Sequence, residues 1–148
     1  MASTLPRATV SWLNSQSNDV VPLGLKASAT VYPGCIVATD ATGFAVNGAT
    51  SATLKVWGIL KAPASAGSPI TNSGASGSIV IEVQQGVFGF DNAGADPVTI
   101  ADIGALVYLV DNVTIARTSN SSARSVAGEM MGLDANGQVY VRLGQALQ

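Results

Sequence analysis

Three aspartates in the middle of the chain have side chains that could bind a metal ion. Asp91, Asp96 and Asp102 follow one another within a short stretch. Ca²⁺ prefers about six to eight oxygen ligands, many of them from carboxylates. The stretch does not have EF-hand spacing, because the bidentate Glu that closes such a loop is absent. We therefore interpret the three residues as acids of a solvated loop and predict no metal site.

Three other aspartates occupy positions that are typical of hairpin turns. Asp40, Asp111 and Asp134 each stand between two short runs of apolar residues. An Asp side chain accepts hydrogen bonds from the backbone two residues further on, which stabilises a turn. A structural role is therefore expected for these carboxylates.

Two glutamates interrupt otherwise apolar segments. Two carboxyl groups at a suitable separation can perform acid–base catalysis. A single polar residue on a strand usually faces the solvent, because successive side chains point to opposite faces. We expect Glu82 and Glu129 to form ion pairs with Lys55, Arg124 or Arg142, each contributing about 0–1 kcal/mol.

The remaining candidate for covalent chemistry is the lone cysteine. Cys35 would need a neighbouring base or a helix N-terminus to become a nucleophile, and the sequence contains no His. A Ser-His-Asp triad and a His-ligated metal are excluded for the same reason. We predict that Cys35 is a small buried residue and that the chain has no catalytic residues, no cofactor and no enzymatic activity.

The composition narrows the possible partners. Charged residues make up 11% of the 148 residues, against roughly 25% in an average soluble domain. The seven basic residues are scattered, so no basic patch predicts direct nucleic-acid binding. No apolar run of about 18 residues predicts a membrane span, and no signal-peptide pattern is expected at the N-terminus. The mean hydropathy of +0.36 suggests a neutral surface that partner subunits partly cover.

The elements that would position these residues are short strands. Residues 1–25 are rich in Ser, Asn and Pro, and we expect an extended N-terminal arm. Residues 26–148 are expected to form a single β-rich domain, because β-branched runs alternate with Gly, Pro, Asn and Asp turns. The Asn136-Gly137 pair predicts a tight hairpin. One short helical turn is expected near Thr99. The predicted fold class is all-β, a small barrel or sandwich with two similar halves and an N-terminal arm.

An internal repeat relates the two halves. Gly34, Val37, Val56 and Gly58 recur 70 residues later as Gly104, Val107, Val126 and Gly128. Each half therefore contains a Gly before one strand and a Val-x-Gly motif in a later strand. We expect pseudo-repeat halves at about residues 30–90 and 98–144.

The same segments carry a family resemblance. "YPGCIVATDATGFAVNG", "LKVWGILKA" and "GSIVIEVQQGVFGFD", followed by "IGALVYLVDNVTIART" and "SVAGEMMGLDANGQVYVRLG", resemble tailed-phage head decoration (capsid cement) proteins of the lambda type and its prophage relatives. The resemblance covers roughly residues 24–144. The second half and the longer arm depart from the lambda type.

The resemblance implies a virion protein on the outer surface of the phage capsid, made in the host cytoplasm. It implies a homotrimer that clamps neighbouring major capsid protein subunits of the expanded head. The arm would add a strand to the coat protein, and Trp is enriched at interface hot spots. We expect capsid contact from Arg7, Val10, Trp12 and Leu13. The alternative is a tail or fibre component that is structural or binds a receptor.

Overall fold

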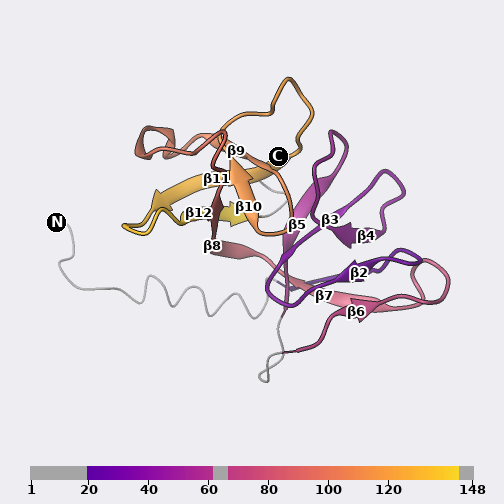
Figure 1. The fold of residues 1–148 in the computed structure, drawn as a ribbon. Helices are drawn as coiled ribbons and strands as arrows, with labels where there is room; N and C mark the ends of the chain where they lie inside the picture. Colours follow the sequence, from indigo (N-terminus) through magenta and orange to yellow (C-terminus); the bar gives the residue numbers. More distant parts are fainter. Residues whose placement is uncertain (1–19, 62–66, 144–148) are drawn as a thin grey trace.

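The computed structural model of the chain describes residues 20–61 and 67–143. The regular secondary structure of this part of the chain is almost entirely β-strand, which confirms the predicted all-β class. The arm residues for which we expect capsid contact, Arg7, Val10, Trp12 and Leu13, lie outside the described residues. Figure 1 shows the strands gathered into two groups that follow one another along the chain.

The first group, here called the first unit, covers residues 20–84. Five strands form one sheet in the order β1-β7-β5-β3-β4, and β2 (Thr30–Val31) and β6 (Ile70–Thr71) form a separate two-stranded ribbon. The sheet strands are β1 (Val20–Gly24), β3 (Ile36–Thr39), β4 (Ala45–Asn47), β5 (Lys55–Leu60) and β7 (Val80–Gln84).

The second unit covers residues 86–143 and forms a closed five-stranded barrel in the order β10-β8-β12-β11-β9. A 3₁₀ turn, η2 (Ile100–Asp102), precedes β9, close to the helical turn expected from the sequence. The barrel strands are β8 (Gly86–Asn92), β9 (Leu106–Leu109), β10 (Thr114–Ala116), β11 (Val126–Leu133) and β12 (Val139–Leu143).

The two units pair their strands in the same register. In the first unit Val37 is paired with Gly58 across β3 and β5. In the second unit Val107 is paired with Gly128 across β9 and β11. A register irregularity follows at the same place in each pair of strands. Residues 70 positions apart are therefore structurally equivalent through these strands.

The Val-x-Gly motif has the same physical cause in both units. A Cβ atom added at Gly58 would lie 2.2 Å from the backbone oxygen of Gln84, and one added at Gly128 would lie 2.0 Å from that of Arg142. Neither site has room for a side chain, because the neighbouring strand approaches too closely. The repeated glycines are therefore a requirement of strand packing.

The sheet of the first unit also curls toward closure. The Lys26 N–H donates to the Ala45 carbonyl at 3.0 Å, beside a parallel bridge between Leu25 and Ala45. In the second unit the Ala93 N–H donates to the Ile115 carbonyl at 2.9 Å, where β8 and β10 run parallel. The same contact thus joins the first and third sheet strands of each unit.

The position of β1 differs from the sequence-based expectation. The range 1–25 was expected to form an arm, yet residues 20–24 pair with β7 as an integral strand of the first sheet. The repeating units accordingly cover residues 20–84 and 86–143, whereas the sequence suggested about 30–90 and 98–144. The equivalent strands β1 and β8 are 67 rather than 70 residues apart, so a comparison at a fixed spacing of 70 residues does not align them.

Each unit has its own hydrophobic cluster, but two strands of the first unit, β3 and β5, contribute to both. Val37 of β3 belongs to the core of the first unit. Its neighbours Ile36 and Ala38 are fully buried in the cluster that contains the core of the second unit. Successive strand residues point to opposite faces, so the outer face of β3 packs toward the second unit.

Candidate interaction surface

The three clustered aspartates do not assemble into a metal site. Asp102 accepts hydrogen bonds from the Thr99 N–H at 2.8 Å and pairs with the Arg117 guanidinium at 3.1 Å. These contacts, with the Thr99 N–H first, lower the pKa of Asp102 below its usual value. Asp91 is the next-to-last residue of β8 and is exposed. Among the described residues, no group of three or more His, Cys, Asp or Glu side chains is placed to hold a metal ion.

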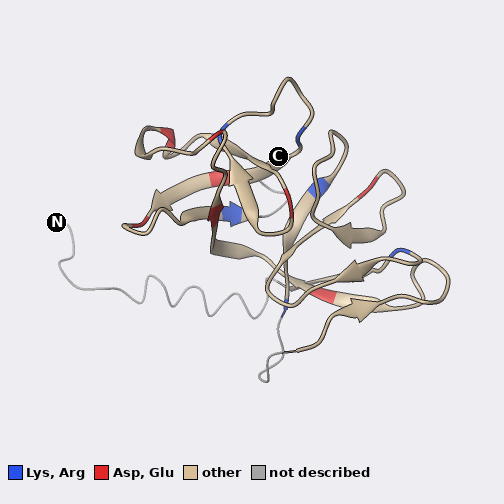
Figure 2. Ribbon diagram, viewed as in Figure 1, with Lys and Arg blue, Asp and Glu red and all other residues tan. Residues whose placement is uncertain are grey.

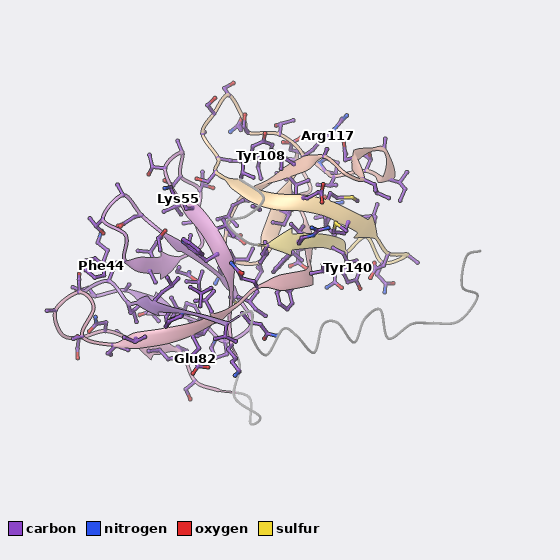
Figure 3. The ribbon with its side chains drawn as sticks, turned by 180° about the vertical axis from the view of Figure 1, so that it is seen from behind. Phe44, Lys55, Glu82, Tyr108, Arg117 and Tyr140 are labelled. Carbon is purple, nitrogen blue, oxygen red and sulfur yellow. The ribbon has the colours of Figure 1, made fainter. Side chains whose placement is uncertain are left out.

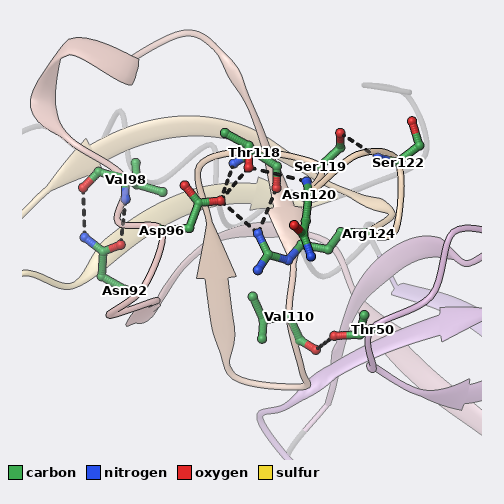
Figure 4. Close-up of polar contacts among 10 residues, drawn as sticks. All are labelled: Thr50, Asn92, Asp96, Val98, Val110, Thr118, Ser119, Asn120, Ser122 and Arg124. Carbon is green, nitrogen blue, oxygen red and sulfur yellow. Dashed lines mark hydrogen bonds and ion pairs between the residues drawn. The ribbon is translucent and has the colours of Figure 1, made fainter.

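Asp96 organises a surface loop instead. Figure 4 shows its carboxylate accepting the Thr118 hydroxyl at 2.6 Å, the Thr118 N–H at 3.1 Å and the Arg124 guanidinium at 2.8 Å. The hydroxyl is the first of the contacts that lower the pKa of Asp96. This network holds loop 117–124, in which Asn120, Ser121 and Ser122 all have positive φ angles.

The aspartates at the hairpins bond their local backbone, which confirms the prediction for these residues. Asp111 accepts the Val113 N–H at 2.9 Å, and Asp134 accepts the N–H groups two and four residues further on. Asp40 accepts the Thr42 N–H at 2.9 Å and also forms an ion pair with Lys26. The hydrogen bond from Lys26, followed by that from the Thr42 hydroxyl, lowers the pKa of Asp40 to about 2.

The two strand glutamates lie on different units and form separate ion pairs. Glu129 lies 3.6 Å from Arg142, which confirms one of the ion pairs expected from the sequence. Glu82 lies 3.4 Å from Lys61, which is not among the partners expected from the sequence. Figure 3 places Glu82 and Lys55 in the first unit. Lys55 has no ion pair among the described residues, because none of the acidic side chains described lies within salt-bridge distance.

Cys35 is partly exposed rather than fully buried. Burial raises the pKa of its thiol, and the negative charge of Asp111 raises it further. Both effects disfavour the thiolate, which is the reactive form. The environment of Cys35 therefore opposes nucleophilic chemistry.

A hollow of about 610 Å³ lies where the end of β8 meets the β11–β12 turn. It is lined on one side by residues 91–94 and Pro97, and on the other by Asn136, Gly137 and Gln138. Asp91 is the ionisable residue among these lining residues. The lining offers amides and backbone but no grouped catalytic side chains.

Contacts between the units form a defined junction, which consists of β3, β5 and loop 47–54 against turn 110–112 and Ser125. The Ile36 N–H donates to the Asn112 carbonyl at 2.9 Å. The Ser125 hydroxyl accepts the Leu54 N–H at 2.9 Å and donates to the Ser51 carbonyl at 2.6 Å. The junction therefore combines these hydrogen bonds with apolar contacts between buried side chains.

The loop of the first unit strengthens the junction. The Thr50 hydroxyl donates to the Val110 carbonyl at 2.6 Å (Figure 4). Ala49 forms an antiparallel bridge with Asp111, and Asn112 donates from its amide to Asn47 at 3.2 Å. Turn 110–112 is thus held on several sides by the first unit.

The second unit presents its own apolar face to solvent. Along β9, Val107 and Leu109 are buried, whereas Leu106 is 43% exposed and Tyr108 is half-buried. Ile103 beside the 3₁₀ turn is 52% exposed. Val126 at the start of β11 is half-buried and is paired with Tyr108. We call the outer side of β9 and β11, with Leu106, Tyr108 and Val126, the open face.

Charges are sparse over both units. Figure 2 shows isolated blue and red segments separated by long neutral stretches. The ion pairs described above engage most of these charges locally. This part of the chain would therefore attract a highly charged partner only weakly over long range. Shape and apolar contact are better suited than charge to binding on this surface.

The described residues contain no helix with the length and apolar character needed to cross a membrane. Comparison of the chain with family models, curated proteins and solved structures gives no match.

Proposed function

We propose that the protein is a phage capsid decoration protein that binds the outer surface of the expanded head as a homotrimer and clamps adjacent major capsid protein subunits. Its work is binding alone. The added contacts raise the free energy required to separate the coat subunits, and no chemical step is involved. The family resemblance of the strand motifs supplies the identity of the partner.

The structural observation that supports the proposal is the self-sufficiency of residues 20–143. These residues supply both β-units, the junction and the buried clusters. Within residues 20–61 and 67–143, no buried side-chain nitrogen or oxygen lacks a hydrogen-bond partner. The described strands find their pairing partners within residues 20–61 and 67–143, and the proposal assigns residues 1–19 to the coat protein.

Strand addition is the mode of contact that suits this arrangement. Main-chain hydrogen bonds can join two subunits without charged side chains, which is consistent with the low charge of the chain. Residues 1–19 lead directly into β1, an outer strand in the order of its sheet. In the proposal Trp12 is the main anchor of the arm, because Trp is enriched at interface hot spots, and Leu13 adds apolar surface next to it.

The test uses expanded, undecorated heads of the virus that encodes the chain. Light scattering is measured on the purified protein and on its mixture with heads, and the proposal expects a trimer mass and saturable binding. Deletion of residues 1–19 is expected to leave a folded trimer that no longer binds. Equal binding by the truncated protein would overturn the role of the arm, and a monomer that ignores heads would overturn the function.

Copy number separates this function from the alternative of a tail or fibre component. A decoration protein approaches the abundance of the coat protein in purified virions, whereas a tail protein is far rarer. Quantitative mass spectrometry of virions measures this ratio directly. A low ratio would favour the tail component and contradict the decoration role.

A further inference from the structure

The open face of the second unit has a structural equivalent that is covered in the first unit. Leu106 and Tyr108 correspond to Ile36 and Ala38, because β9 and β3 align at the 70-residue spacing. Ile36 and Ala38 are fully buried at the junction, whereas Leu106 is 43% exposed. The same surface of the repeat is therefore covered in the first unit and exposed in the second unit.

The complementary surface shows the reverse pattern. Turn 110–112 of the second unit receives β3 and loop 47–54 at the junction. Its equivalent in the first unit is turn 40–42, where Ala41 and Thr42 are exposed. Two complementary surfaces are therefore left uncovered in the described residues, the open face on the second unit and turn 40–42 on the first unit.

From this asymmetry we infer that the open face binds turn 40–42 of a second copy of this chain, in a head-to-tail repetition of the internal junction. By equivalence, Leu106 and Tyr108 pack on the first unit of the second copy. The Leu106 N–H then faces the Thr42 carbonyl of that copy, as the Ile36 N–H faces the Asn112 carbonyl at 2.9 Å within one chain.

The residues of the open face suit such a contact. Three of its positions keep the apolar character of the internal junction: Leu106 for Ile36, Tyr108 for Ala38 and Val126 for Val56. Glu129 replaces Ile59 beside its strand partner Leu106 and forms an ion pair with Arg142. An apolar centre with a polar border is the usual composition of an interface between separately folded chains.

Loop 117–124 distinguishes the two contacts. Its equivalent, loop 47–54, reaches across the junction through Thr50 and Ser51. Loop 117–124 is instead held back on its own unit by Asp96 (Figure 4). The contact between copies therefore relies on the strand face and has fewer loop contacts, which makes it weaker than the internal junction.

A head-to-tail contact closes into a ring when its rotation allows. Three chains would place six units around such a ring, joined by alternating internal and intermolecular junctions. The number of copies rests on the proposed function, whereas the contact itself rests on the repeat. Self-association without heads and binding to heads are separate measurements, so the two inferences can fail independently.

The test uses the full chain and two variants that each damage one half of the contact. Leu106→Arg places a charge on the open face, and Ala41→Arg places one on the receiving turn. Analytical ultracentrifugation is expected to give a mass close to one 14.9 kDa chain for either variant alone. An equimolar mixture is expected to form a complex of two chains and no larger species, because each variant supplies the intact half that the other lacks.

Val80→Arg is the matched control. Val80 is 64% exposed on β7, outside both halves of the contact, and this variant is expected to keep the wild-type mass. Circular dichroism verifies that all three variants are folded. Because Leu106, Ala41 and Val80 are exposed, an arginine at each position can reach solvent.

Several results would overturn the inference. A wild-type chain that stays monomeric at high concentration has no such contact, and variants that keep the wild-type mass place the contact elsewhere. A mixture that stays monomeric rules out the head-to-tail arrangement.

If Leu106→Arg loses head binding but keeps the wild-type mass, the open face contacts the coat protein instead. If the mixture forms the complex but the wild type ignores heads, the contact stands and the decoration function fails.

Discussion

The two β-units share their strand order and register, yet the outer faces of β3 and β9 have different environments. Ile36 of β3 is fully buried against the second unit, whereas Leu106 of β9 keeps 43% of its surface exposed. The difference comes from packing, because the second unit lies against the outer face of β3, whereas no strand of the described residues covers the outer face of β9. The comparison shows that the burial of a repeated residue depends on its neighbouring unit as well as on its own strand.

The largest expected effect tests that difference directly. Ile36→Ala removes a fully buried side chain and should destabilise the chain by roughly 2–5 kcal/mol. Leu106→Ala changes an exposed side chain at the equivalent strand position and should cost less than about 1 kcal/mol. Urea unfolding, at a concentration where the chain is monomeric, measures both values. Equal losses would contradict the proposed difference in burial.

The next prediction concerns a feature that the units share. Gly58→Ala and Gly128→Ala each place a Cβ against the backbone of the neighbouring strand. Each substitution should cost about 1–3 kcal/mol, because the strands must separate to accept it. Thermal unfolding of both variants is compared with that of the control Gly132→Ala, which has open space on β11. A large loss in one unit only would show that the two strand pairs are not equivalent.

These repeated positions explain how much of the fold the sequence predicts. Short apolar runs bounded by turn residues locate the hairpins, and Asn136-Gly137 marks the turn before β12. The Val-x-Gly motif is visible because a steric requirement leaves glycine at both positions. The strand β1 was missed because Pro22 and Gly24 interrupt its pattern.

The candidate surface is much harder to predict. The sequence places Ile36 and Leu106 on equivalent strands, but their different burial depends on how the units dock. Leu54, Ser51 and Ser125 come together at the junction from segments about 70 residues apart, and no local pattern reports such a contact. The sequence predicts only a solvated acidic loop for the clustered aspartates, and nothing in their spacing reports that Asp96 and Asp102 bind different partners.

A smaller effect is expected from the polar border of the junction. Ser125→Ala leaves the Leu54 N–H and the Ser51 carbonyl without the hydroxyl that joins them. An unsatisfied group at a buried site costs about 1–2 kcal/mol. Hydrogen exchange should show faster opening of loop 47–54, and urea unfolding gives the total loss. The exposed Ser68→Ala is the control, and an equal effect of both substitutions would contradict the role of Ser125.

The smallest expected effect is the pH dependence of the stability of turn 40–42, the turn that would contact the open face of another copy. The Lys26 ammonium and the Thr42 hydroxyl and N–H hold the pKa of Asp40 near 2, below its ordinary value of 3.8. Because the folded pKa is the lower one, the stabilisation is complete above about pH 4 and is lost as the pH falls toward 2. NMR titration of the Asp40 carboxyl carbon measures this pKa.

Two variants show whether the Asp40 effect is local to its turn. Lys26→Met should return the pKa of Asp40 toward 3.8, because it removes the first of the contacts that lower it. It should leave the pKa of Asp96 lowered, since that carboxylate depends on Thr118 and Arg124 of the second unit. Thr118→Val should instead return the pKa of Asp96 toward its ordinary value and leave the pKa of Asp40 lowered. If Lys26→Met changed both titrations equally, the two acids would be coupled through the junction, and the units could not be treated as separate electrostatic environments.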